Sequence, residues 1–272
     1  MIPIEKTQDS FYIWREDAFP DLELLKAQYT DHAFPRHFHT TYAIEVIEQG
    51  VNQFQCDGKL YTAGAGTIII FNPGQIHSGM SLGKEGVKYR ALYPTVEMLS
   101  EISLSIGGSA EPVFSQPLYY DSYVSEKILQ THKIIETNPN SLEAESSLCL
   151  TLTDLIQKYC YQTKKKEPTS SRFEIELVCD YILENIDKKI SLNDLSKVAG
   201  LSKFHLLRTF QRCMGLTPNE YIINVRVNMA KKLLRENYPP IEVAQKTGFY
   251  DQSHLSRHFK GIVGTTPGRY NF

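Results

Sequence analysis

Three histidines and a glutamate in the first third of the sequence could together hold a ligand. His37 and His39 are two residues apart on a predicted strand, so their side chains share one face, and Glu45 has the same parity. His77 follows the turn Pro73-Gly74-Gln75-Ile76. Imidazole and carboxylate groups in such a set can ligate iron, manganese or zinc. They can equally line a pocket for an organic molecule, or simply pack.

Nearby polar and aromatic side chains favour the organic ligand over the metal. The two arginines among them favour an anionic or polar small molecule. We therefore predict a site without metal or cofactor, formed by Arg36, His37, His39, Tyr42, Glu45, His77, Arg90 and Tyr93.

The elements that must position this site read as β-structure. The runs 42–47 and 67–71 are predicted strands. Between them, 53–56 and 59–62 flank Asp57-Gly58, a pair typical of a type I′ hairpin turn. Many short strands with glycine-rich turns indicate a sandwich or a small barrel.

Two helical patterns follow, at about 122–137 and 141–161. In the second, an apolar seam recurs at helical spacing: Leu148, Leu152, Leu155 and Tyr159. This seam could pack on the chain's own first domain, or it could pair with a second copy of the chain. We predict the second arrangement, a homodimer.

A change of composition and charge separates the two ends of the chain. Residues 163–171 are polar, charged and interrupted by a proline, as expected of a linker. Residues 1–165 carry 13 Lys and Arg against 20 Asp and Glu, and residues 166–272 carry 16 against 11. A basic C-terminal part indicates that this part approaches a polyanion.

The C-terminal part contains an internal repeat with an offset of 49 residues. Nine positions are identical in the two copies, among them His205 and His254, Arg208 and Arg257, and Pro218 and Pro267. Each copy reads as helix, tight turn and helix, the pattern of a helix-turn-helix module. A long helix from 218 to about 237 joins the copies and would span roughly 30 Å.

The repeat resembles a known family. The motifs Leu201-Ser202-x-x-x-Leu206-x-Arg208-x-Phe210 and Gly215-x-Thr217-Pro218-x-x-Tyr221, with the run 248–270, are similar to the AraC/XylS transcription regulators. Residues 36–94 resemble the cupin-like effector-binding domain of that family.

The predicted fold is α+β with two domains. Residues 1–162 form a cupin-like effector-binding and dimerisation domain, with a β-barrel at about 30–115 followed by helices at about 122–161. Residues 163–171 are the linker, and residues 172–272 form an all-α DNA-binding domain with two helix-turn-helix modules joined by the long helix.

The resemblance implies that the helices at 202–214 and 251–263 read DNA. Arg208 and Arg257 suit guanine, and Gln252 suits adenine. Leu207 stands where the family favours a polar residue, and it either suits a thymine methyl or weakens the specificity of this module. Lys203 and Arg212 suit phosphate. The predicted DNA-facing set is Lys203, Phe204, Leu207, Arg208, Gln211, Arg212, Gln252, Ser253, Ser256, Arg257 and Lys260.

The expected partners are double-stranded DNA, a small-molecule effector, RNA polymerase and a second copy of the chain, with no membrane. Five scattered cysteines without a Cys-x-x-Cys pair, and a start without a secretion signal, favour the cytoplasm. We predict a regulator and not an enzyme. A metal-dependent cupin enzyme with a DNA-binding tail and a constitutive DNA binder are the alternatives.

Overall fold

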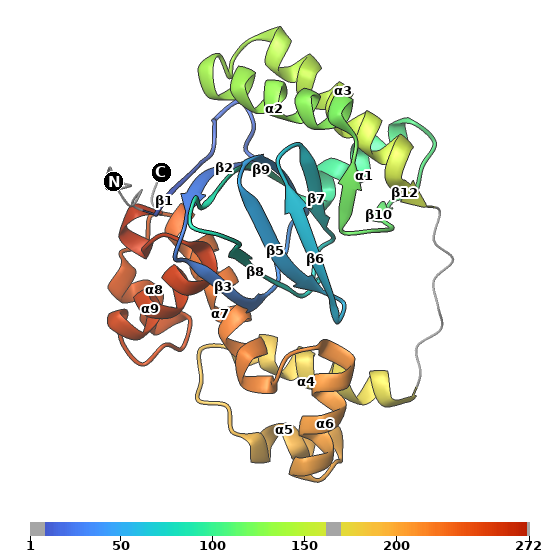
Figure 1. Cartoon of the computed structure of the whole chain (residues 1–272). Helices are drawn as coiled ribbons and strands as arrows, with labels where there is room; N and C mark the ends of the chain where they lie inside the picture. Colours follow the sequence, from blue (N-terminus) through green and yellow to red (C-terminus); the bar gives the residue numbers. More distant parts are fainter. Residues whose placement is uncertain (1–8, 162–169, 271–272) are drawn as a thin grey trace. The chain divides into compact units, whose positions relative to one another are not determined.

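The structure is a computed structural model that describes residues 9–161 and 170–270 (Figure 1). Its contacts define two units, one of residues 1–33 and 39–163 and the other of residues 34–38 and 164–272. Most of the predicted linker lies outside the described residues, which end at 161 and resume at 170. None of the helices in the described ranges is long and apolar enough to cross a membrane.

Antiparallel sheets dominate the N-terminal half of the chain. The larger sheet has the order β1 (Ser10–Trp14), β2 (Leu22–Tyr29), β9 (Val87–Pro94), β4 (Ala43–Gln49), β7 (Thr67–Phe71) and β11 (Leu118–Tyr120). A second sheet has the order β3 (Ala33–His37), β8 (His77–Ser81), β5 (Val51–Cys56) and β6 (Lys59–Gly64). A short pair joins β10 (Val113–Phe114) to β12 (Cys160–Tyr161). Strands β1 and β2 thus extend the sheet to residues before the predicted start of the barrel.

The two larger sheets pack face to face. The rings of Phe54 on β5 and Phe71 on β7 meet edge to face at 5.5 Å, and the Tyr29 hydroxyl on β2 donates to Asn52 Oδ1 on β5 at 3.4 Å. The predicted hairpin is confirmed: β5 and β6 pair across a turn in which Asp57 and Gly58 have φ values of 50° and 74°. Positive φ at both central positions is what a type I′ turn requires.

Three helices accompany the sheets: α1 (Val96–Ser105), α2 (Ser122–Thr137) and α3 (Leu142–Tyr159). Helices α2 and α3 pack with one face of the larger sheet in a single apolar core. Leu148, Leu152 and Leu155 belong to this core, and Tyr159 packs against it. This corrects the prediction that these four residues form a dimer interface, because three of them are buried within one chain and Tyr159 is half-buried against the same core.

The second unit is helical. It contains α4 (Ser170–Glu184), α5 (Leu192–Ala199), α6 (Lys203–Met214), α7 (Pro218–Arg235), α8 (Pro240–Lys246), α9 (Gln252–Val263) and the 3₁₀ turn η1 (Pro267–Arg269). The pairs α5–α6 and α8–α9 are the two helix-turn-helix modules, and α7 joins them.

Local sequence signals fix where these helices begin and end. Ser191 with Asp194, and Thr217 with Glu220, form reciprocal capping boxes at the starts of α5 and α7. Gly200, at φ 64°, ends α5 in the left-handed conformation that glycine adopts without strain. The predicted joining helix is therefore confirmed, although α7 ends at Arg235, two residues before the predicted end.

A buried arginine on α7 connects both modules. Arg226 is 9 % exposed, and its guanidinium donates to the carbonyls of Ile186 (3.1 Å) and Lys188 (2.8 Å) in the segment before α5. The same guanidinium lies 6.0 Å from the ring centre of Phe249, just before α9. Gly248 approaches it so closely that an added Cβ would lie 2.7 Å from the Arg226 Nη2 atom. One side chain therefore holds the first module, the joining helix and the second module together.

We predict that Arg226→Met lowers the free energy of unfolding by roughly 1.5–3 kcal/mol, because it removes hydrogen bonds made by a charged donor. The matched control is Arg269→Met, which alters an exposed arginine of the same unit. It should change the free energy of unfolding by less than about 0.5 kcal/mol. Urea unfolding of the full chain measures both. Equal effects of the two variants would contradict the assigned role of Arg226.

The burial of the α3 side chains in the core leads to a second prediction. Leu152 is fully buried, so Leu152→Ala should lower the free energy of unfolding by about 2–5 kcal/mol through lost burial and a cavity. Leu150, on the same helix, is 57 % exposed, and Leu150→Ala should cost less than about 0.5 kcal/mol. Thermal unfolding and light scattering of both variants test this. A Leu152→Ala protein that keeps its stability but forms a smaller assembly than the wild type would instead support the dimer interface.

Candidate nucleic-acid interface and ligand site

Helix α6 presents a polar side opposite its buried side. Leu206 and Phe210 are fully buried and fix the inward direction. Five members of the predicted DNA-facing set are exposed on this helix: Lys203, Phe204, Arg208, Gln211 and Arg212. Leu207 differs, because it is half-buried and lines a hollow with Leu195 of α5 and Ile222 of α7. Its departure from a polar residue is thus explained by packing between helices.

Helix α9 repeats the arrangement. Leu255 and Phe259 are fully buried. The opposite side carries Gln252, Ser253, Arg257 and Lys260 as exposed residues, with Ser256 half-buried. Arg208 and Arg257 therefore occupy the same position on two equivalent helices, as the repeat predicts.

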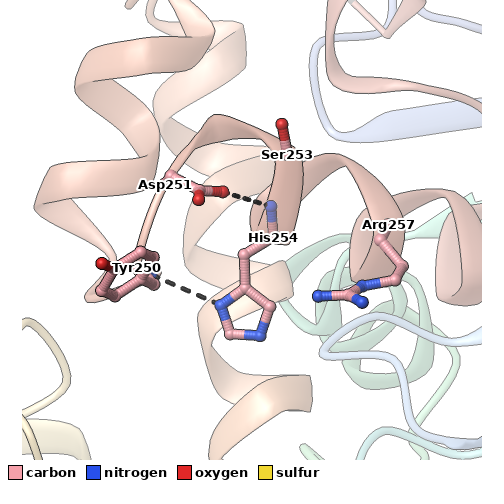
Figure 2. A pocket seen from close by; sticks show the side chains of 5 residues that line it. All are labelled: Tyr250, Asp251, Ser253, His254 and Arg257. Carbon is pink, nitrogen blue, oxygen red and sulfur yellow. Dashed lines mark hydrogen bonds between the residues drawn. The ribbon is translucent and has the colours of Figure 1, made fainter.

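The start of α9 forms an open hollow lined by Tyr250, Asp251, Ser253, His254 and Arg257 (Figure 2). The Asp251 carboxylate accepts the His254 amide N–H at 2.7 Å and so caps the helix. The Tyr250 amide N–H donates to His254 Nδ1 at 3.4 Å, and His254 Nε2 lies 3.1 Å from Nε2 of His258. These contacts fix the orientation of the imidazole next to Arg257.

Sequence reasoning missed Tyr250. Its side chain is 92 % exposed, an unusual state for a large aromatic residue, and it shares the hollow with Arg257. The signal was weak, because Tyr250 follows the buried Phe249 and has no identical partner in the first copy of the repeat.

Two of the three histidines of the predicted ligand site lie together, because the ring centres of His39 and His77 are 5.0 Å apart. His37 belongs to the other unit. Nδ1 of His37 is 2.8 Å from the Pro35 carbonyl, and Nδ1 of His77 is 2.9 Å from the Gln75 carbonyl. A carbonyl only accepts, so Nδ1 carries the proton in both rings.

Glu45 lies apart from the histidines, on the inner face of the larger sheet. Its neighbours Ile44 and Val46 belong to the core shared with the helices, so Glu45 points to the opposite face, towards the second sheet. Tyr93 alternates in the same way beside Leu92, and its ring lies 5.2 Å from that of His39. Burial raises the pKa of the Glu45 carboxyl to about 8.

The remaining predicted ligand residues point elsewhere. Tyr42 belongs to the helix-facing core, and its hydroxyl donates to the Pro112 carbonyl at 2.7 Å. Arg36 donates to the Gly215 carbonyl within the second unit. Their grouping with Glu45 is therefore corrected by the strand alternation and by these contacts.

Arg90 is also on the helix-facing side, where it lies in a buried polar network. Its guanidinium donates to Glu48 at 3.3 Å, to His132 Nδ1 at 2.9 Å and to Glu136. The pKa of His132 is lowered to about 4, first by burial and then by the charge of Arg90. Because Arg90 and Arg36 lie elsewhere, neither arginine of the predicted site favours an anionic ligand between the sheets.

Comparison with known proteins agrees with this architecture. The family model of the AraC-like ligand binding domain matches residues 19–152, and that of a helix-turn-helix domain matches residues 195–271. The HTH-type transcriptional regulator YbfI of Bacillus subtilis is 34 % identical over 223 residues, which cover 82 % of this chain and 81 % of that protein.

Solved structures show the same two-domain fold. An apo ToxT variant from Vibrio cholerae superposes with a TM-score of 0.62 at 16 % identity, covering 93 % of this chain and 97 % of that one. ToxT with a bound unsaturated fatty acid gives a TM-score of 0.58 at 16 % identity, covering 98 % and 96 %. The matched ligand-binding and helix-turn-helix domains, with the similarity to YbfI along most of both chains, establish that this chain belongs to the AraC/XylS family of transcription regulators.

Proposed function

We propose that this regulator reads two successive major grooves of DNA with α6 and α9, and that a small molecule held between its two sheets controls it. The observation that carries the first part is the pair of equivalent outward arginines, Arg208 and Arg257, on helices that share one scaffold. Arginine grips guanine O6 and N7 with two donors, so each helix offers a specific base contact.

The length of α7 supports a separation of about one DNA turn between the two recognition helices. Its 18 residues span about 27 Å at 1.5 Å per residue, and one turn of B-DNA is about 34 Å. A joining helix shorter than the turn would require the DNA to bend before both modules engage. The operator's bendability would then add to its sequence as a determinant of affinity.

The second part rests on the matched ligand-binding domain and on the polar groups between the sheets. ToxT, which shares the fold, has been solved with an unsaturated fatty acid. The proposed site of action is the cytoplasm, where the DNA-bound regulator would meet RNA polymerase at a promoter.

We predict that Arg257→Ala costs about 1–3 kcal/mol of DNA-binding free energy and relaxes the preference at one base pair, whereas Lys203→Ala weakens binding to all sequences alike. Lys133→Ala is the control, because it removes an exposed lysine of α2 in the other unit and should leave binding unchanged. Fluorescence anisotropy with DNA from upstream of the gene, at several salt concentrations, measures all three. Binding without salt dependence would contradict a phosphate-contacting interface.

The two-groove arrangement predicts where each arginine acts. Arg208→Ala and Arg257→Ala should alter base preference in two segments about one turn, roughly 10 base pairs, apart. Selection of binding sites from random DNA with each variant locates these segments. Both effects at the same base pairs would rule out reading by two successive grooves.

A further inference from the structure

Glu45 is a buried acid without a partner. It is 7 % exposed, and its side chain has neither a hydrogen bond nor an ion pair within the described parts of the chain. Its nearest cross-strand neighbours are Ala91 on β9 and Ile69 on β7, both fully buried and apolar. Burial of a polar group without a compensating contact is costly, so such groups call for an explanation.

The other acid on this face differs. Glu23 on β2 is opposite Tyr93 in the sheet, and its carboxylate lies 3.9 Å from the Arg15 guanidinium. Glu45 has no such cation, and its cross-strand neighbours Ala91 and Ile69 are small or apolar.

Tyrosine side chains lie on the same sheet face as this acid. Tyr89 and Tyr93 alternate onto this face of β9, and Tyr29 on β2 meets Tyr89 edge to face at 6.0 Å. Glu45 interacts electrostatically with both Tyr29 and Tyr89. Aromatic faces attract cations, most strongly where water is excluded. A buried carboxylate on the same sheet face as several tyrosine rings therefore has the chemistry of a site for an organic cation.

We propose that the inner face of the larger sheet binds an organic amine in its ammonium form, with Glu45 as the anionic partner and the tyrosines as aromatic walls. This inference rests on the proposed effector function and names the chemical class of the effector. It also replaces the anionic ligand that the sequence suggested.

Binding of this kind carries a protonation signature. The pKa of Glu45 is raised to about 8, so the carboxyl holds its proton at pH 7 while the site contains no cation. An ammonium group stabilises the carboxylate, and the displaced proton passes to the buffer. A carboxylic acid ligand would have the opposite preference, because it would face a like charge or leave Glu45 protonated.

The test compares matched pairs of probes on the full chain. Tyramine and phenethylamine are compared with 4-hydroxyphenylacetate and phenylacetate, which place a carboxylate where the amines carry nitrogen, and oleate represents the fatty acids. We expect only the amines to raise the melting temperature. Calorimetry of the stabilising amine in phosphate and in MOPS, at pH 7, should show release of about one proton per site.

Two variants show whether Glu45 is responsible. Glu45→Gln should abolish both the stabilisation and the proton release, whereas Glu143→Gln, an exposed acid on α3, should preserve both. Stabilisation by a carboxylate that Glu45→Gln leaves intact would overturn the amine site but support effector binding. A panel in which no compound stabilises the chain would count against the effector site itself, and would leave the DNA-reading proposal to its own tests.

A measurement without any ligand tests the unpartnered state of Glu45. Because burial raises the pKa of Glu45 to about 8, the wild type should lose stability relative to Glu45→Gln as the pH rises from about 5 to about 8. The facing hydroxyls of Tyr29 and Tyr89 have raised pKa values and stay neutral over this range. His39, whose ring lies 5.2 Å from that of Tyr93, is present in both proteins. A difference that stays constant with pH would mean that Glu45 already has a cationic partner, and would overturn the inference.

Discussion

The arrangement of the two helix-turn-helix modules depends on one buried cation. Arg226 donates to two carbonyls before α5 and lies beside the Phe249 ring before α9, so both modules pack against the same side chain of α7. Burial lowers the pKa of this guanidinium, but arginine stays charged in proteins, and its planar group can serve several partners at once. If α6 and α9 are held in this way, they approach DNA as one rigid body and not as two tethered domains.

A rigid connection between the two modules would give the repeat a functional consequence. A 49-residue offset places the same outward arginine on two helices, but only a fixed joining element converts two base contacts into a fixed spacing on DNA. Gly248 belongs to the same constraint, since its φ of 71° and its closeness to the Ile186 carbonyl leave no room for a side chain. A residue remote from the proposed DNA contacts thus supports their geometry.

Local signals were predictable from the sequence, and remote packing was not. The Asp57-Gly58 turn and the joining helix depend on residues within a few positions of each other, so pattern alone located them. The α3 seam has the spacing of an interface and of a core alike, and only the partner surface distinguishes the two. Arg90 and Glu45 likewise differ by strand face, and the sheet register that separates them depends on pairings across the whole domain. The sequence therefore indicated a ligand-binding barrel, but the charge that its inner face presents emerged only from the structure.

The most direct test of the central claim is the affinity of the full chain for its operator after insertion of five base pairs between the segments read by α6 and α9. Half a turn moves the second segment to the opposite side of the duplex, which a rigid reader cannot follow. If the two modules form one rigid body, the operator with the five-base-pair insertion should bind the chain no better than an operator whose second segment is scrambled. An affinity equal to that of the intact operator would contradict it, and would show that the modules move independently.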